Sequence, residues 1–341
     1  MADSVLLREI GEQPAAVARF LDAEASRVEH LVAPWRRADL RFVLVVARGT
    51  SDNAARYAQY VFGALAGLPV ALAAPSLVTL YGAPPRVDGG LVVGISQSGR
   101  SPDVVETVAA ARRAGAPTLA IVNDAESPLA RAAADVLPLG AGPERSVAAT
   151  KTYTTQLAAV ALLAASLAGT RRVVADLRRI PRSMEAALGT EAAVKRAARR
   201  LASATRAVVL ARGMNFPTAH EISLKLKELA LLLAEPYSFA DFRHGPIAMA
   251  GRRLPAIVVA PRGSRPAAEL DALAARLRAG RNPVVVIGPS GPGSIPLPAV
   301  PEILSPLVAV IPGQLLAFHA ARVRGLDPDN PRGIRKVTET R

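Results

Sequence analysis

Glu221, Lys225 and Glu228 have the residue types and the spacing of an acid–base group. They belong to the stretch HEISLKLKE, residues 220–228. In a helix, residues three and four positions apart lie on one face, so two carboxylates would flank one ammonium group. A carboxylate held in this way in a partly buried cleft is suited to moving a proton to and from carbon. The alternative is a solvated row of ion pairs, each worth roughly 0.2–0.5 kcal/mol.

Lysine is rare in this chain, so its positions are informative. Lys and Arg together number 42, and only five of them are Lys. Four of the five stand among other reactive or polar side chains: Lys151, Lys225, Lys227 and Lys336. Lys can lose its proton and form a Schiff base with a carbonyl group, whereas Arg cannot. Lysine therefore occurs here where its chemistry, and not only its charge, is useful.

Two turns rich in small polar side chains indicate an anion-binding site. ARGTSDN, residues 47–53, and ISQSGRSPD, residues 95–103, each follow an apolar run that reads as a strand. The second turn carries Ser96, Gln97, Ser98 and Ser101. Hydroxyl groups and free backbone N–H groups before a helix suit phosphate. The alternative is an ordinary Ser-rich turn in which Ser101 or Asp103 caps the helix that begins near Asp103.

A third hydroxyl cluster surrounds Lys151 in SVAATKTYTTQ, residues 146–156. Its Thr150 and Thr152 either contact the same anion or cap the apolar helix expected over residues 156–169. The two turns described above match neither GxxxxGK(S/T) nor GxGxxG, so nucleotide binding is not expected.

His244, in the loop FRHGP, is a second acid–base candidate because imidazole titrates near neutrality. The alternative is a histidine that merely bonds to backbone. The four histidines show no HxH or HxxxH spacing, and the chain has no Cys. The sequence therefore predicts no metal site, no cofactor, no disulfide and no thiol nucleophile.

The elements that must position these residues form a duplicated unit. Ala-Arg-Gly follows a strand-like run at 47–49 and again at 211–213. Two further pairs of segments match in the same order, residues 89–99 with 254–264 and residues 108–123 with 273–288. The two members of each of the three pairs are about 165 residues apart, which indicates an internal repeat. Short apolar runs such as FVLVV alternate with helical segments, a pattern typical of parallel sheets covered on both faces.

We therefore predict an α/β fold of two tandem three-layer α/β/α sandwiches, each on a mainly parallel, flavodoxin-like sheet. The expected division is a helical segment at 1–35, a first sandwich at 36–170, a helical linker at 171–200, a second sandwich at 201–322 and a tail or lid at 323–341. The tail is rich in Pro, Gly and Asp, which disfavours regular structure.

Composition narrows the classes of partner. The chain has 341 residues, of which 50% are hydrophobic and 21% charged, as in a globular protein of about two domains. A net charge of +14 suggests nucleic acid, but the arginines are scattered and no nucleic-acid motif occurs. No signal peptide is visible, and the longest apolar stretch, 156–169, is too short to span a bilayer. We expect neither a nucleic-acid nor a membrane partner, and a cytoplasmic location.

Together these motifs resemble the double sugar-isomerase (SIS) domain proteins related to the isomerase half of glucosamine-6-phosphate synthase. The matching stretches occur in the family's order over nearly the whole chain: REIGEQP (8–14), RGTSDNA, ISQSGRSPD, SVAATKTYTTQ, EISLKLKE, FRHGP and NPRGIRKVT. The likeness is greatest to stand-alone SIS-type glucosamine-6-phosphate deaminases. Arg100 and Ser101 depart from the acidic residue and the Thr of the synthases. Without a glutaminase domain or a Cys, release of ammonia from glutamine by the synthase route is not expected.

The resemblance implies a role for each site residue. The sugar phosphate would be held by Ser51, Ser96, Gln97, Ser98 and Ser101, together with the backbone near Val147. Glu228 would carry a proton between C1 and C2, supported by Glu221 and Lys225. His244 would assist ring opening and would come from the partner subunit of a homodimer. Lys336 would meet the open-chain carbonyl.

The function that follows is a glucosamine-6-phosphate deaminase/isomerase, which would yield fructose 6-phosphate and ammonia without a metal or nucleotide cofactor. Two alternatives stay open. One is another amino-sugar or aldose/ketose phosphate isomerase, including amination with free ammonia. The other is a non-catalytic sugar-phosphate-binding regulator. The expected partner in each case is a phosphorylated amino sugar or ketose, and the sequence leaves open its identity, the direction of flux and any effector.

Overall fold

Two five-stranded parallel sheets form the framework of the protein. The computed structural model describes residues 4–289, 291 and 293–336. These residues divide into two units. Unit 1 contains the described residues of Met1–Pro14, Arg145–Thr150 and Arg179–Ile334, and unit 2 those of Ala15–Glu144, Lys151–Arg178 and Arg335–Arg341. The five-segment division expected from the sequence stays a prediction.

The sheet of unit 2 has the strand order β2-β1-β3-β4-β5, with every neighbouring pair parallel. Its strands are β1 (Phe42–Val46), β2 (Val70–Leu72), β3 (Gly90–Ser96), β4 (Thr118–Val122) and β5 (Asp135–Pro138). All seven residues of β3 are buried. Such a strand is apolar along its whole length because helices cover both faces of the sheet.

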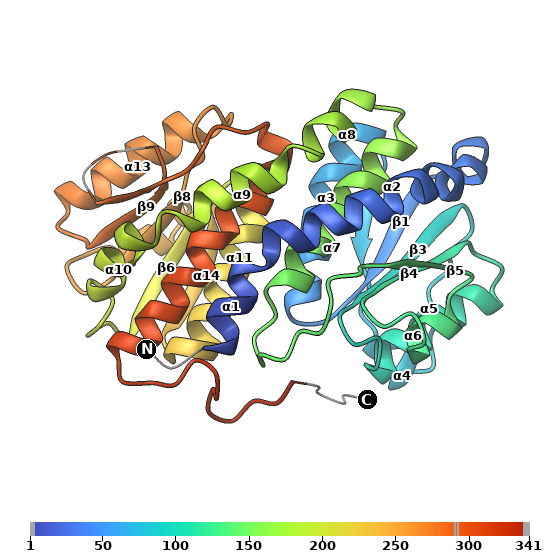
Figure 1. Ribbon diagram of the computed structural model, residues 1–341, viewed down its shortest axis with the longest axis horizontal. Helices are drawn as coiled ribbons and strands as arrows, with labels where there is room; N and C mark the ends of the chain where they lie inside the picture. The colour runs from blue at the N-terminus through green and yellow to red at the C-terminus, as the bar shows by residue number, and fades with distance from the viewer. Residues whose placement is uncertain (1–3, 290, 292, 337–341) are drawn as a thin grey trace. The chain divides into compact units, whose positions relative to one another are not determined.

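Helices cover both faces of this sheet (Figure 1). Strand residues such as Leu44 and Val92 form one apolar cluster with Val104, Val108 and Leu129 of the helices on one side. The helices on this side are α5 (Pro102–Arg113), α6 (Pro128–Ala132) and the short α4 (Ser76–Thr79). On the other side α3 (Thr50–Ala66) packs on the strands and on α7 (Lys151–Leu167), next to α8 (Arg171–Leu177). Nearly all of α7 is buried, which confirms the core helix expected there.

The sheet of unit 1 repeats the first one strand for strand. Its strands are β6 (Arg206–Ala211), β7 (Leu233–Ser238), β8 (Ala256–Val259), β9 (Val284–Gly288) and β10 (Ser294–Pro296). Their order is β10-β9-β8-β6-β7, again with all pairs parallel. Read from the other edge, this order is that of the first sheet with each strand number raised by five. The predicted duplication and the predicted parallel sheets are both confirmed.

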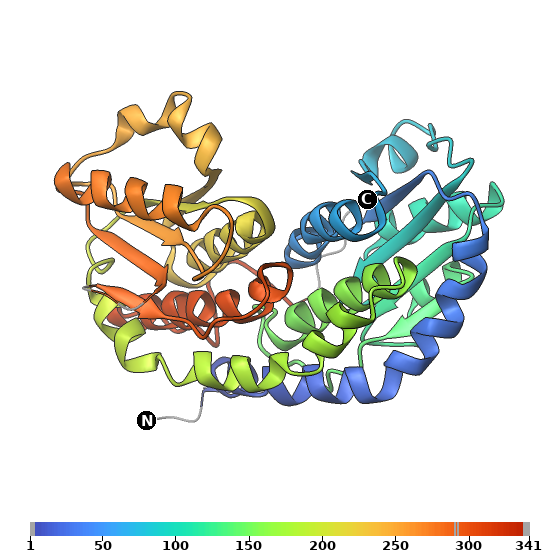
Figure 2. The same ribbon diagram turned by 90° about the horizontal axis from the view of Figure 1, so that it is seen from above.

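Unit 1 places its helices on opposite faces of this sheet, with α13 (Ala267–Ala279) on one side and α14 (Ser305–Val323) on the other (Figure 2). α12 (Phe239–Arg243) joins α13 in one apolar cluster, and α11 (Phe216–Ala230) packs along α14. The remaining elements around them are α1 (Val5–Gly11), α9 (Ile180–Leu188), α10 (Glu191–Arg199), η1 (Gly213–Asn215), η2 (Pro246–Met249) and η3 (Glu302–Leu304). α2 (Gln13–Arg37) falls almost wholly in unit 2.

One segment of the described chain, Glu302–Val323, is long and apolar enough to cross a membrane, with a mean hydropathy of 1.6. The expectation that 156–169 is the longest apolar stretch is therefore wrong. Within the protein 94% of this stretch is buried, because α14 packs against α11, α9 and α10. Its apolar surface is therefore used as the core of unit 1.

Gly313 allows α14 to approach α11 closely. A Cβ atom at this position would lie 2.3 Å from Cγ1 and 2.5 Å from Cδ1 of Ile222. These distances are far below a normal contact, so a larger side chain must displace Ile222 or separate the two helices. This close packing matters for the site, because α11 carries Glu221, Lys225 and Glu228.

Replacing Gly313 by Val should therefore lower the free energy of unfolding by about 2 kcal/mol or more. Gly63→Val is the matched control, because the nearest atom to a Cβ there is Leu68 O at 4.0 Å, and it should change stability by less than about 0.5 kcal/mol. Urea unfolding followed by far-UV circular dichroism measures both. Equal effects of the two substitutions would contradict the packing described here.

Candidate functional site

The carboxyl ends of β1 and β3 lie side by side in unit 2, since Val46 pairs with Gly94 in the parallel ladder. The strand order reverses here, with β2 on one side of β1 and β3 on the other. In doubly wound sheets ligands bind at this switch point, outside the carboxyl ends of the strands. α3 begins at Thr50 and α5 at Pro102, directly after these two strands. The structure thus brings Ser51 and the turn 96–101 to one edge of the sheet.

The turn after β3 is held by its own serines. Ser96 Oγ accepts a hydrogen bond from Gly99 N at 3.0 Å, and Ser98 Oγ accepts one from Arg100 N at 3.3 Å. Gly99 has φ +63°, and a Cβ there would lie 2.2 Å from Ser127 Oγ. Ser101 is the N-cap residue of α5, but its hydroxyl makes no capping hydrogen bond. Ser101 therefore occupies the capping position without a capping side-chain hydrogen bond, and its role in holding a ligand stays a prediction.

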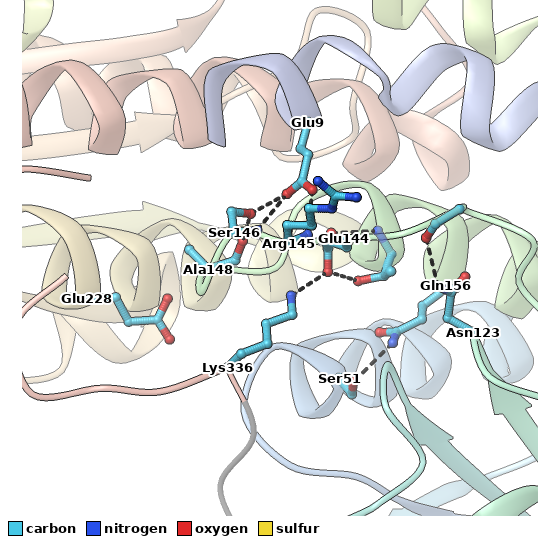
Figure 3. Close-up of polar contacts among 12 residues, drawn as sticks. Glu9, Ser51, Asn123, Glu144, Arg145, Ser146, Ala148, Gln156, Glu228 and Lys336 are labelled. Atoms are coloured by element: carbon cyan, nitrogen blue, oxygen red, sulfur yellow. Dashed lines mark hydrogen bonds and ion pairs between the residues drawn. The ribbon is translucent and has the colours of Figure 1, made fainter. Parts of the chain in front are cut away.

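Ser51 is fixed by α7. Gln156 Nε2 donates a hydrogen bond to Ser51 Oγ at 3.0 Å, and both residues are buried (Figure 3). The bond joins the first turn of α3 to α7 across 105 positions of the chain. The sequence alone did not suggest a role for Gln156, because its partner is so far away in the chain.

Arg48 was also missed from the sequence. Its Nε lies 2.7 Å and its Nη2 2.6 Å from Asp103 Oδ2. The side chain of Asp103 is only 2% exposed, whereas that of Arg48 is half exposed. The ion pair ties the end of β1 to the first turn of α5.

In unit 1, α11 holds the predicted acid–base group on one face. Lys225 Nζ lies 3.3 Å from Glu221 Oε1 and 2.6 Å from Glu228 Oε2. The side chains of Lys225 and Glu221 are 1% and 0% exposed, whereas that of Glu228 is 23% exposed. The solvated ladder considered above is therefore wrong, because two of its three members are inside the protein. Glu228 alone of the three can reach solvent or a ligand.

The charge of Lys225 is stabilised by its two neighbours. Burial by itself would lower the pKa of this amine, but the carboxylates of Glu221 and Glu228 outweigh burial and hold the pKa above its usual range. Lys225 is thus a fixed cation at neutral pH. It supports Glu228 electrostatically, and its own amine is not the reactive group.

His244 and Val147 lie in loops of unit 1. His244 follows α12 and is exposed. The segment that contains Val147 is tied to α1 by Glu9, a buried residue whose carboxylate accepts hydrogen bonds from Arg145 N, Ser146 N and Ser146 Oγ (Figure 3). Glu9 belongs to the stretch REIGEQP, but its role could not be read from the sequence because its partners are 136 and 137 positions away.

Lys336 lies in unit 2, where it forms an ion pair with Glu144. Lys336 Nζ is 3.1 Å from Glu144 Oε2. Glu144 also accepts hydrogen bonds from Thr152 N at 3.1 Å and Thr152 Oγ1 at 2.7 Å. Since α7 begins at Lys151, Thr152 lies inside the helix and does not cap it.

The model of the SIS domain family matches residues 38–166 and 200–324. The chain belongs to the SIS domain family. It is 35% identical over 357 residues to a glutamine–fructose-6-phosphate aminotransferase (isomerizing) of Gloeobacter violaceus, which covers 97% of this chain. The chain spans 58% of that relative's length. The resemblance to a SIS protein, and to the isomerase half of the amino-sugar-phosphate synthase, is confirmed.

Two solved structures are similar over nearly the whole chain. A protein of Silicibacter pomeroyi, described as a candidate phosphosugar isomerase, is 35% identical with a TM-score of 0.84, covering 96% of this chain and 100% of that one. A glucosamine-6-phosphate deaminase of Thermotoga maritima has a TM-score of 0.80 at 23% identity, covering 99% of this chain and 100% of that one. At this identity the second likeness shows the fold alone.

Lys225→Ala should lower the free energy of unfolding at pH 7 by about 3–5 kcal/mol, because it leaves the buried carboxylate of Glu221 without its cation. Lys227→Ala, two positions away, is the control and should change it by less than about 0.5 kcal/mol. The pKa of Lys225 is raised in the folded state, so its contribution is complete below the unfolded value of 10.5 and falls as the pH rises beyond it. Urea titrations at pH 7 and above pH 10.5 should show the gap between wild type and Lys225→Ala narrowing at high pH.

Gly99→Ala should weaken the binding of inorganic phosphate at least about tenfold, because the added Cβ collides with Ser127 and deforms the turn. Gly115→Ala is the matched control. Gly115 also has a positive φ, +85°, but nothing lies within 4 Å of an added Cβ. Isothermal titration calorimetry with phosphate measures both variants. Unchanged phosphate affinity in Gly99→Ala would show that the turn is not the anion site.

Proposed function

We propose that this chain is a sugar-phosphate isomerase of amino-sugar metabolism, and specifically a glucosamine-6-phosphate deaminase. The observation that carries the proposal is the geometry of Glu228. This carboxylate is partly exposed and lies 2.6 Å from the buried ammonium of Lys225. It is held in one orientation and remains accessible, as a base that moves a proton between neighbouring carbons must be.

The phosphate would be bound by the serine-rich edge of the sheet in unit 2. Ser51, Ser96, Gln97, Ser98 and Ser101 supply hydroxyl, amide and backbone groups at the N-termini of α3 and α5. The two helix dipoles favour a dianionic ligand. The backbone near Val147 would contact the sugar, which gives a reason for Glu9 to fix that segment.

The reaction is a proton transfer followed by hydrolysis. In the open-chain substrate, Glu228 removes the proton from C2, next to the C1 aldehyde, and an enolamine forms. The same proton returns to C1, which converts C1 to a hydroxymethyl group and C2 to an imine. Water adds to the imine and ammonia leaves, so glucosamine 6-phosphate and water become fructose 6-phosphate and ammonia. Every step is acid–base chemistry at carbon, nitrogen or oxygen.

The remaining residues have supporting roles in this proposal. His244 opens the sugar ring by proton transfer, since imidazole titrates near neutral pH. Its exposed position after α12 is compatible with delivery to the site of a second subunit in a homodimer. Lys336 meets the carbonyl of the open-chain sugar. Lys225, itself held by Glu221, keeps the carboxylate of Glu228 oriented.

A second candidate is the same chemistry in the direction of amination, from fructose 6-phosphate and ammonia. The 35% identity to a glutamine–fructose-6-phosphate aminotransferase favours it. Both directions are tested by one experiment. Purified protein is incubated with glucosamine 6-phosphate while ammonia and fructose 6-phosphate are measured, and with fructose 6-phosphate plus ammonium while glucosamine 6-phosphate is measured. A panel of other aldose and ketose phosphates covers the wider isomerase class.

Glu228→Gln should lower kcat by about 10²–10⁴-fold, because the amide cannot accept the C2 proton. Binding of fructose 6-phosphate, measured by calorimetry, should change by less than about threefold, since the phosphate site is elsewhere. Lys227→Ala is the control and should keep wild-type kcat. Tight binding of sugar phosphate without turnover in the wild type would instead identify a regulator.

A further inference from the structure

The last described residue of the chain is held by a buried carboxylate. Glu144 has a fully buried side chain, and Lys336, which pairs with it, is 25% exposed. Residues 325–336 contain neither helix nor strand. A segment without regular structure depends on side-chain contacts for its position. The contact of Lys336 with Glu144 therefore anchors the end of the described chain, Arg335 and Lys336, within unit 2.

Glu144 has a reason to require a cation. A carboxylate removed from water is costly unless a positive charge and hydrogen-bond donors surround it. Thr152 supplies a backbone N–H to Oε1 and a hydroxyl to Oε2, and Lys336 supplies an ammonium group to Oε2 (Figure 3). Lys336 is thus one of the groups that offset the cost of burying this carboxylate.

The same carboxylate is connected to the anion-binding edge of unit 2. Thr152 lies one helical turn before Gln156 on α7, and Gln156 donates to Ser51 Oγ at 3.0 Å. Glu144 and one turn of the buried helix α7 therefore fix the position of the Lys336 amine relative to Ser51. A sugar phosphate has a fixed number of bonds between its phosphate and its carbonyl. A protein that binds both groups must hold its two contacts at a matching separation.

We propose that Glu144 is a positioning residue for Lys336: within unit 2 it docks the end of the described chain, Arg335 and Lys336, and fixes the place of the amine. The assignment of this amine to a sugar carbonyl rests on the proposed function, whereas the docking does not. In a competing reading Glu144 serves only to secure the start of α7 through Thr152, and its contact with Lys336 has no consequence.

Limited proteolysis separates the two readings without any substrate. Trypsin can cleave after Arg332, Arg335 and Lys336, and mass spectrometry follows cleavage after Arg332 and Arg335, the two sites that every variant keeps. Glu144→Gln and Lys336→Met should each raise the cleavage rate about tenfold or more, and the double variant should be no faster than either single one. Lys336→Arg preserves the charge, and its cleavage rate should stay within about twofold of wild type. Glu269→Gln removes an exposed carboxylate of unit 1 that pairs with Arg212, and it should have no effect.

Additive effects of Glu144→Gln and Lys336→Met, or unchanged cleavage in either, would overturn the docking. Non-additive acceleration supports it, because only a shared interaction gives that result.

Steady-state kinetics tests the positioning. With glucosamine 6-phosphate, Glu144→Gln should lower kcat about 10–100-fold and change KM less than about threefold. Lys336→Arg should lose activity although its tail stays docked, since Arg cannot give up its proton or form a Schiff base. Wild-type kcat in Glu144→Gln would overturn the positioning role. If the wild-type protein turns over no sugar phosphate, the proposed function fails, and the proteolysis result still decides the docking.

Discussion

Buried carboxylates persist in this protein because each is supplied with a cation or with several hydrogen-bond donors. The strongest case is Glu221, which has no exposed side-chain surface and lies 3.3 Å from the ammonium of Lys225. Removing both charges from water is costly, and the attraction between them repays that cost only when the geometry is good. α11 must therefore stay packed against α14, with Gly313 at the contact, for the pair to exist. The orientation of Glu228 is a consequence of that packing, because Lys225 is held from both sides.

The same constraint organises unit 2. Asp103 is paired with Arg48, and Glu144 with Lys336, and both carboxylates are almost completely buried. Each pair joins segments that are far apart in the chain. Arg48 and Asp103 join a strand end to a helix start, and Lys336 and Glu144 join the end of the described chain to the loop before α7. A chain with a net charge of +14 has many cations to place. The Lys and Arg side chains that pair with buried carboxylates fix the positions of the segments they join. The other cations contribute to the surface potential.

Local patterns in the sequence predicted the framework well. Runs such as FVLVV and LVVGIS became β1 and β3, the helix expected near Asp103 begins at Pro102, and HEISLKLKE is helical. These features depend on neighbours a few residues apart. The contacts that complete the candidate site do not depend on such near neighbours, because their partners are far apart in the chain. Glu144 meets Lys336 across 192 positions, and Gln156 meets Ser51 across 105. Spacing could likewise place Glu221 and Lys225 on one face of a helix, but their burial depends on α14, about 90 residues away.

Features that occur in both repeats belong to the shared fold, whereas features that occur in one repeat alone point to its function. Arg48 and Asp103 of unit 2 correspond in the repeat to Arg212 and Glu269 of unit 1, which also form an ion pair. Each pair joins the end of a central strand, β1 or β6, to the start of the helix that follows the neighbouring strand in the sheet, β3 or β8. This ion pair therefore belongs to the repeated fold. The serines do not repeat in this way: the turn after β8 reads PRGS, and its Ser264 hydroxyl donates to Pro261 O at 2.8 Å. An ion pair common to both units is explained by the sheet they share. Hydroxyl groups concentrated in one unit require a different explanation, and the anion-binding site proposed for unit 2 would supply it.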